Sequence, residues 1–246
     1  MNETLRTLQS HRSIRSYTGE PVSDAMLDQI VRAAWHAPTS MNAQEISLVV
    51  VRDADKRARI AELAGGQPWI AQAPVFIAIV IDFHKTDLGV RKGGQTQIIH
   101  ESMEGFGVAA VDAGIVLGSL MTAARSLGLG IVPIGGIRRN PQGMIDLLGL
   151  PPLTFPLVGV CIGHIANDSP QKPRMDIATF RHDERYDASG YAAAIDAYDE
   201  TLVHHWKEVA RSEGLPWSAT LASRLHTVYF PQVKPVAAMQ GLLNDK

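Results

Sequence analysis

The sequence predicts an α+β fold, and three observations lead to that expectation. Apolar runs typical of buried strands are short, and helical patterns of uneven length separate them. Few strand–helix–strand units are compact enough to force neighbouring strands to run parallel. No internal repeat, low-complexity stretch or long linker divides the chain. The strand-like runs lie at residues 46–51, 75–82, 130–136 and 157–164.

The first two predicted helices have signals at their ends. For the helix 24–37, Ser23 is a suitable N-cap, and Pro38 closes the helix because proline lacks a backbone N–H. The second helix, residues 53–64, is amphipathic and lies between the first two strands. Gly65 ends it, since glycine readily adopts the conformation that terminates a helix.

The longest predicted helix, residues 105–127, contains the least polar stretch of the chain, residues 107–124. Asp112 and several glycines interrupt that stretch, so a membrane span is not expected. We predict a fully buried helix in the core or at a subunit interface. Gly114 and Gly118 share a face, where another backbone can approach closely.

The remaining part of the chain continues the mixed pattern. A short helix, residues 141–148, separates the last two strands. A long helix is predicted over residues 191–210, residues 211–217 break it, and an irregular tail follows.

The composition is that of a globular protein without a general affinity for nucleic acid. Of the 246 residues, 46% are apolar and 20% charged, and the formal net charge is −2. Cys161 is the only cysteine, and neither Cys-x-x-Cys nor His-Glu-x-x-His occurs, so no metal site is expected. The first residues lack the basic-then-apolar order of a signal peptide, and we expect a cytoplasmic protein.

Cys161 stands at the centre of residues 159–163 (GVCIG), which have the letters of a nucleophile elbow. An elbow needs a sharp turn from a strand into a helix. The residues that follow contain two prolines and no helical period. A buried strand cysteine is therefore favoured, and a cysteine hydrolase is the weaker hypothesis.

Two basic clusters and one glycine pair are the remaining candidates for a binding site. Arginine side chains together with hydroxyl or backbone N–H donors can bind a phosphate. The alternative is that these basic residues are isolated charges on the surface. The pair Gly135–Gly136 is either a tight turn or a bare backbone against which a flat ligand can lie. The clusters comprise His11, Arg12, Ser13 and Arg15 near the N-terminus, and Lys172 and Arg174 around Pro173.

Five motifs, taken in order, resemble the FMN-dependent nitroreductase family. Within it, the chain is most similar to the branch of oxygen-insensitive major NADPH nitroreductases and NADPH–flavin oxidoreductases. The resemblance implies a sandwich with a central, mostly antiparallel sheet flanked by helices, in an intertwined homodimer. It also implies one domain, residues 1–246, with a C-terminal extension from about residue 188. The motifs are HRSIRSYTGEPVS (11–23), APTSMNAQ (37–44), GGQ (65–67), PIGGIRRNP (133–141) and KPR (172–174).

The same resemblance implies FMN at the dimer interface and the residues that bind it. The two basic clusters would bind the phosphate and ribityl chain, with Arg15 stabilising charge at the pyrimidine edge. Gln67 would lie beside the ring, Pro133–Gly136 along its N5 and O4 side, and Pro38–Ser40 would arrive from the other subunit. The implied set is His11, Arg12, Ser13, Arg15, Pro38, Thr39, Ser40, Gln67, Pro133, Ile134, Gly135, Gly136, Lys172 and Arg174.

The implied activity is that of an NAD(P)H oxidoreductase with a ping-pong mechanism. A nicotinamide would reduce the flavin and leave, and a nitroaromatic, a quinone or free flavin would then accept two electrons. The branch has an arginine-rich loop for the NADPH 2′-phosphate, where this chain offers only Lys207 and Arg211. NADPH is the expected donor, with NADH as the other possibility. A dedicated NADPH–flavin reductase and a non-catalytic FMN-binding protein are the alternative functions.

Overall fold

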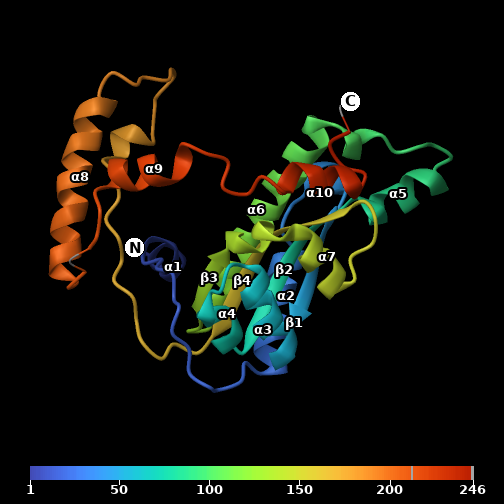
Figure 1. Ribbon diagram of the computed structural model, residues 1–246, viewed down its shortest axis with the longest axis horizontal. Coiled ribbons are helices and arrows are strands. Elements are labelled where there is room, and N and C mark those ends of the chain that lie inside the picture. The colour runs from blue at the N-terminus through green and yellow to red at the C-terminus, as the bar shows by residue number, and fades with distance from the viewer. Residues whose placement is uncertain (212, 245–246) are drawn as a thin grey trace. The chain divides into compact units, whose positions relative to one another are not determined.

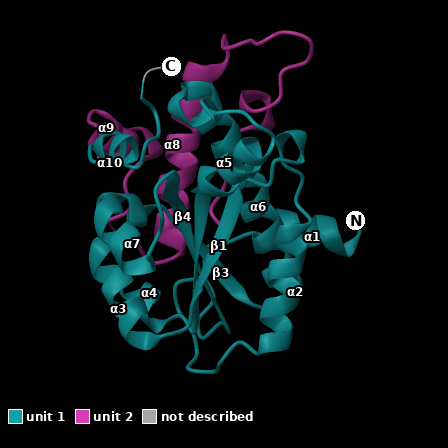
Figure 2. Cartoon of the chain, turned by 90° about the vertical axis from the view of Figure 1, so that its right-hand side faces the viewer, with its two compact units in different colours: residues 1–169, 230–246 teal, residues 170–229 magenta. Residues whose placement is uncertain are grey.

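The computed structural model describes residues 1–211 and 213–244. The chain forms two compact units, residues 1–169 with 230–246, and residues 170–229 (Figure 2). The proposed single domain with its extension therefore stays a prediction, and residues 245–246 of that extension lie outside the described residues.

The first unit contains an antiparallel sheet (Figure 1). Its four strands are arranged in the order β1-β2-β4-β3, and each neighbouring pair runs antiparallel. This arrangement confirms the predicted α+β class and the antiparallel sheet. The strands are β1 (Ile46–Val51), β2 (Val75–Asp82), β3 (Gly130–Ile134) and β4 (Thr154–Gly163).

Helices cover both faces of this sheet, as the resemblance implied (Figure 2). Alternate residues of a strand face opposite sides, so β2 contributes Val75, Ile77 and Ile79 to a core with α2 and α6. The intervening Phe76, Ala78 and Val80 pack with α3, α4 and α7. The helices of this unit are α1 (Glu3–Gln9), α2 (Asp24–Trp35), η1 (Ser40–Asn42), α3 (Ala54–Leu63), α4 (Pro68–Gln72), α5 (Phe83–Lys92), η2 (Ile99–Glu101), α6 (Met103–Ser126), η3 (Gly135–Arg139), α7 (Pro141–Leu148) and α10 (Val233–Met239).

The second unit is helical, with η4 (Ile177–Thr179), α8 (Tyr191–Glu208) and α9 (Trp217–Leu225). Helix α8 confirms the prediction for residues 191–210, apart from its last two residues. Tyr198 on α8 meets Trp217 on α9 edge-on, with ring centroids 6.2 Å apart. Asp199 accepts the Ser218 backbone N–H at 2.9 Å and so satisfies a free donor at the start of α9.

Two expectations about individual elements are wrong. The predicted irregular tail contains α9 and α10. Strand β3 ends at Ile134, because the chain turns into η3 at Gly135, two residues before the predicted end. Within one chain, helix α6 is buried on one face only, so its predicted full burial depends on a subunit interface and stays a prediction. Its Val111 is 63% exposed, and open space surrounds the Cβ position of Gly114.

Among the described helices, α6 is the one whose length and composition would suffice to cross a membrane. In this structure its buried face packs on the sheet, through Ala113, Val116, Leu120 and Ala124.

The structure contradicts the hypothesis of a cysteine nucleophile. Residues 159–163 all lie within β4, and Cys161 is paired with Phe76 on one side and Val132 on the other. Its side chain is fully buried, and burial raises the pKa of the thiol. Without an exposing turn or a thiolate, this residue is a core side chain.

Candidate functional site

The N-terminal basic cluster lies along the edge of the sheet. Within residues 11–18, the Ile14 N–H donates to the Ile131 carbonyl of β3 at 3.1 Å. Ile14 is 2% exposed, and a Cβ at Gly130 would lie 2.7 Å from its Cγ2 atom, so the two residues are in close contact. Arg15, the next residue, is exposed. Burial of Ile14 therefore fixes the position of the basic residues beside it.

Three of the predicted cofactor-binding stretches meet at the corner where β3 ends. The Arg15 guanidinium carbon lies 5.5 Å from the centroid of the Trp69 ring on α4, within cation–π range. Gln67, at the start of the same helix, donates from Nε2 to the Ala64 carbonyl at 2.9 Å. A Cβ at Gly136 would lie only 2.2 Å from that Nε2 atom. The structure thus places Gly136 against Gln67, and Arg15 over Trp69 two residues farther along α4; we call this group the corner.

Arg12 takes part in a second, more polar group. Its guanidinium donates two hydrogen bonds to the Asp168 carboxylate; hydrogen bonding raises the pKa of Arg12 and lowers that of Asp168. Arg125, in the last turn of α6, donates to Ser10 Oγ at 3.0 Å. Burial, and then the charge of Arg12, lower the pKa of Arg125.

Ser10, Arg12 and Arg125 line a cavity of about 170 Å³. Two guanidinium groups line this cavity, and that of Arg12 is paired with Asp168, so the group keeps a net positive charge that favours an anion.

The Pro38–Ser40 segment lies on the other side of the sheet from Gln67, because it follows α2 and is bonded to α6. The Ser40 N–H donates to Asp112 Oδ2 at 2.8 Å, and Thr39 Oγ1 accepts the Gln44 N–H at 3.0 Å. Pro38 and Ser40 are exposed.

Four further predicted residues, Lys172, Arg174, Lys207 and Arg211, belong to the second unit. The Lys172 ammonium and the Arg211 guanidinium each lie 5.3 Å from the Trp206 ring. Arg174 donates to the Lys172 carbonyl at 3.1 Å, and Lys207 is exposed on α8. The Trp206 ring therefore lies within cation–π range of Lys172, predicted to bind the FMN phosphate, and of Arg211, predicted to bind the NADPH 2′-phosphate.

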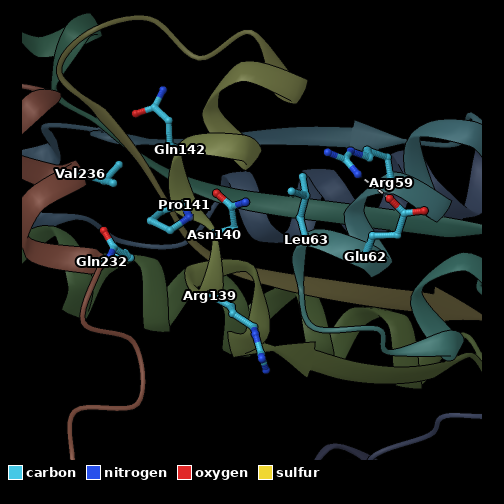
Figure 3. Close-up of a pocket in the computed structure, with 9 residues that line it drawn as sticks. All are labelled: Arg59, Glu62, Leu63, Arg139, Asn140, Pro141, Gln142, Gln232 and Val236. Carbon is cyan, nitrogen blue, oxygen red and sulfur yellow. Dashed lines mark hydrogen bonds and ion pairs between the residues drawn. The ribbon is translucent and has the colours of Figure 1, made fainter.

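A larger cavity of about 610 Å³ lies beside α3, α7 and α10 (Figure 3). A Cβ at Gly65 would meet the Arg139 side chain at 3.1 Å, so this arginine connects the cavity to the 65–67 turn. The cavity is lined by Arg59, Glu62, Leu63, Arg139, Asn140, Pro141, Gln142, Gln232 and Val236.

Sequence reasoning missed several residues of these groups. Trp69 stands two positions after Gln67, so the GGQPW letters contained a signal for it. Asp168 is separated from Arg12 by 156 positions and Arg125 from Ser10 by 115. Pairs so distant in sequence leave no local pattern.

Comparison with known proteins decides the family. The nitroreductase family model matches residues 8–164, and the model of the nitroreductase C-terminal domain matches residues 172–245. This chain belongs to the nitroreductase family. The resemblance carried by the five sequence motifs is thereby confirmed.

Full-length relatives within this family agree in sequence and in fold. The FMN reductase (NAD(P)H) of Bacillus subtilis (strain 168) is 43% identical, and the match covers 100% of both chains. The NADPH-flavin oxidoreductase of Vibrio harveyi is 31% identical over 98% of this chain and 99% of its own. The solved structure of NfrA2 from B. megaterium superposes with a TM-score of 0.97 at 39% identity, covering 100% of both chains. The nitroreductase sandwich is therefore the fold of this protein.

Proposed function

We propose that this protein is an FMN-dependent NAD(P)H oxidoreductase that delivers two electrons to nitroaromatics, quinones or free flavin. The proposal rests on the corner where Arg15, Gln67 and Gly136 meet. A guanidinium, a side-chain amide and a backbone without Cβ atoms suit a flat ring with polar edges. Relatives named FMN reductase and NADPH-flavin oxidoreductase support the same cofactor.

The phosphate end of FMN would lie at the basic clusters. His11, Arg12 and Ser13 would hold it, and the resemblance implies the same role for Lys172 and Arg174. Arg125 supports this assignment, because its guanidinium adds positive charge beside Arg12. An arginine fork binds a phosphate through two parallel hydrogen bonds, which fixes orientation as well as charge.

The residues of the chain would bind and orient rather than transfer protons. Bound FMN would supply two-electron transfer between the nicotinamide and the acceptor. Arg15, held over Trp69, would place positive charge at the pyrimidine edge. The segment Pro133–Gly136 would present backbone groups to the N5 and O4 side. Gly136 is packed so tightly on Gln67 and Ala64 that a side chain there would collide with them.

A homodimer is part of the proposal. The exposed face of α6 carries Met103 and Val111, which are 75% and 63% exposed, next to glycines with open space around their Cβ positions. A second copy would cover this apolar face, which a soluble protein rarely leaves exposed. Pro38–Ser40 and Gln67 lie on opposite sides of the sheet within one chain, in agreement with Pro38–Ser40 serving the flavin of the other subunit. The cytoplasmic location stays a prediction from the sequence.

NADPH is the proposed donor, with Lys207 and Arg211 as ligands of its 2′-phosphate. Trp206 holds Arg211 at 5.3 Å, which restricts the guanidinium before the nucleotide binds. We expect Arg211→Ala to raise the KM for NADPH more than the KM for NADH in steady-state assays. Equal effects on both donors would remove Arg211 from this role.

The decisive experiment is spectroscopic. The purified protein should show the absorbance bands of bound flavin, lose them on anaerobic titration with NADPH, and regain them when nitrofurazone is added. Protein that is yellow but oxidises neither NADPH nor NADH would instead be an FMN-binding protein without this activity. Protein that stays colourless after addition of FMN would refute the proposal.

The same assay separates a broad reductase from a dedicated flavin reductase. We expect comparable kcat/KM values for nitrofurazone, menadione and free FMN, because an open pocket selects poorly among flat acceptors. A strong preference for free FMN would favour the dedicated reductase.

A further inference from the structure

Two buried carboxyl groups beside the 39–44 loop have no part in the mechanism above. Asp112 on α6 is 4% exposed and Glu45 is 2% exposed. A buried carboxylate is unfavourable unless hydrogen bonds replace its lost water. Asp112 meets this need by accepting the Ser40 N–H at 2.8 Å, across 72 positions of sequence.

The loop itself has an unusual backbone. Met41, Asn42 and Gln44 all have positive φ, at 53°, 56° and 55°. This left-handed region is unfavourable for residues other than glycine, and such strain persists only where surrounding contacts impose it. Within the loop, Thr39 Oγ1 accepts the Gln44 N–H. The bond from Ser40 to Asp112 is the contact that ties this strained shape to the rigid helix α6.

Glu45 lies beside Asp112, and its surroundings favour the neutral form of its carboxyl group. Burial is the largest effect that raises the pKa of Glu45, and a hydrogen bond with Asp112 and the charge of Asp112 act in the same direction. Its Oε2 atom has no hydrogen-bond partner among the described residues, which an ionised carboxylate would require. A hydrogen bond from the Glu45 backbone and then the charge of Lys85 on α5 lower this pKa, and the Asp82 N–H of β2 bonds to the Glu45 carbonyl rather than to its side chain.

We propose that Asp112 is a positioning residue of the flavin site, with Glu45 as the partner that shares a proton with it. The pair holds the 39–44 loop in the strained shape that presents Thr39 and Ser40 to the flavin. This inference rests on the proposed function, because the role of Thr39 and Ser40 belongs to it. Asp112 acts through the backbone of Ser40 and does not itself touch the cofactor.

The pair makes FMN affinity depend on pH with a defined sign. When the pH rises through the raised pKa of Glu45, a second negative charge forms beside Asp112. The two carboxylates then repel, the Ser40 contact weakens, and FMN binds less tightly. Below that pKa the protonated Glu45 keeps its proton and donates a hydrogen bond to Asp112, and the loop is held.

The test is a titration of the full-length apoprotein with FMN, followed by flavin fluorescence over a series of pH values. Asp112→Ala should weaken FMN binding by about tenfold, the size of a lost hydrogen bond to a charged group. Asp112→Asn keeps an oxygen for Ser40 and should restore most of the affinity while losing the pH dependence. Glu45→Gln is permanently neutral and should bind FMN equally well across the series.

Asp55→Asn, an exposed acid in the first turn of α3, is the control and should leave both affinity and pH profile unchanged. Thermal unfolding of each apoprotein separates positioning from general stability. The proposal is overturned if Asp112→Asn binds FMN as weakly as Asp112→Ala, or if Glu45→Gln keeps the wild-type pH profile. The second criterion holds even if Asp112→Ala does not fold. A wild-type apoprotein that takes up no FMN refutes the proposed function instead.

Discussion

At the scale of single residues, Gly136 is the most constrained position of the candidate site. In Gly136→Ala the new Cβ would lie 2.6 Å from the Ala64 carbonyl oxygen, which is backbone and cannot move alone. We expect a loss of about 1–3 kcal/mol in the free energy of unfolding from overpacking. FMN affinity should fall by about tenfold or more, because Gln67 must move with it. Urea unfolding and FMN titration measure the two effects.

Gly89→Ala provides the control for this substitution. Gly89 lies in α5 with nothing within 4 Å of its Cβ position, so alanine should stabilise the helix by about 0.5–1 kcal/mol. If Gly136→Ala resembles Gly89→Ala in stability and FMN affinity, the close packing of Gln67 on Gly136 is not needed for FMN binding.

The Arg12–Asp168 pair predicts a small pH effect on stability. The folded-state pKa of Asp168 is lowered, so its contribution is complete above the ordinary pKa of aspartate and disappears as the pH falls through the lowered value. Both side chains are substantially exposed, at 34% and 55%, which limits the contribution to below about 1 kcal/mol. Wild type and Asp168→Asn should therefore differ in the free energy of unfolding by urea near pH 6, about two units above the ordinary pKa of aspartate. In strong acid the two proteins should have the same free energy of unfolding. A difference that persists in acid would assign the effect to something other than the ion pair.

Residue motifs were the most predictable part of the site. Arg15, Gln67 and Gly136 belong to motifs that could be recognised from their letters, and the structure brings them together. Asp168 could not be predicted, because its role depends on which distant residue the fold places against it. Local letters specify donors and acceptors, whereas pairing between them is a property of the tertiary structure.

At the scale of elements, the N-terminal segment depends on one anchor. Ile14 is nearly fully buried on β3, and its neighbours are the basic residues of the cluster. Ile14→Ala leaves a cavity and should cost about 2–5 kcal/mol of unfolding free energy. It should also weaken FMN binding, since Arg12, Ser13 and Arg15 lose their fixed positions. Leu5→Ala on α1, where the side chain is 45% exposed, should change stability by less than about 0.5 kcal/mol.

Chemical unfolding and FMN titration of the Ile14→Ala and Leu5→Ala proteins provide the comparison. Unaltered FMN affinity in a folded Ile14→Ala protein would show that the basic residues do not need this anchor.

The strands could be predicted from the sequence, whereas three of the helices could not. The strands were predicted because they are continuous apolar runs, as β2 shows with seven of its eight residues buried. Helix α5 was missed because it begins directly after β2, where Asp82 serves as both strand end and cap by accepting the Lys85 N–H at 3.0 Å. Helices α4 and α10 are only five and seven residues long, too short for a periodic pattern to be distinguished from a turn.

The whole molecule raises the question of how two copies assemble. Val111→Glu would place an unpaired charge on the apolar face of α6 and should dissociate the proposed homodimer. The monomer should also lose FMN, because Pro38–Ser40 would no longer reach a second flavin. Light scattering during size-exclusion chromatography measures the mass, and absorbance measures bound flavin.

Leu88→Glu on α5, where the leucine is 58% exposed, is a control of similar exposure and should remain dimeric. Retention of the wild-type mass by Val111→Glu would mean that this face of α6 does not form the interface.

The two basic clusters act together in cofactor binding only if both bind the same phosphate. Arg12 belongs to the first unit and Lys172 to the second, so a double-mutant cycle on FMN affinity tests the connection directly. Arg12→Ala and Lys172→Ala should each weaken binding, and together they should deviate from additivity by about 0.5–3 kcal/mol if they share the phosphate. Arg12→Ala combined with Lys207→Ala should be additive within about 0.5 kcal/mol, because Lys207 is assigned to the nicotinamide nucleotide. Additivity in both pairs would separate the two clusters and leave the phosphate to Arg12 and its neighbours alone.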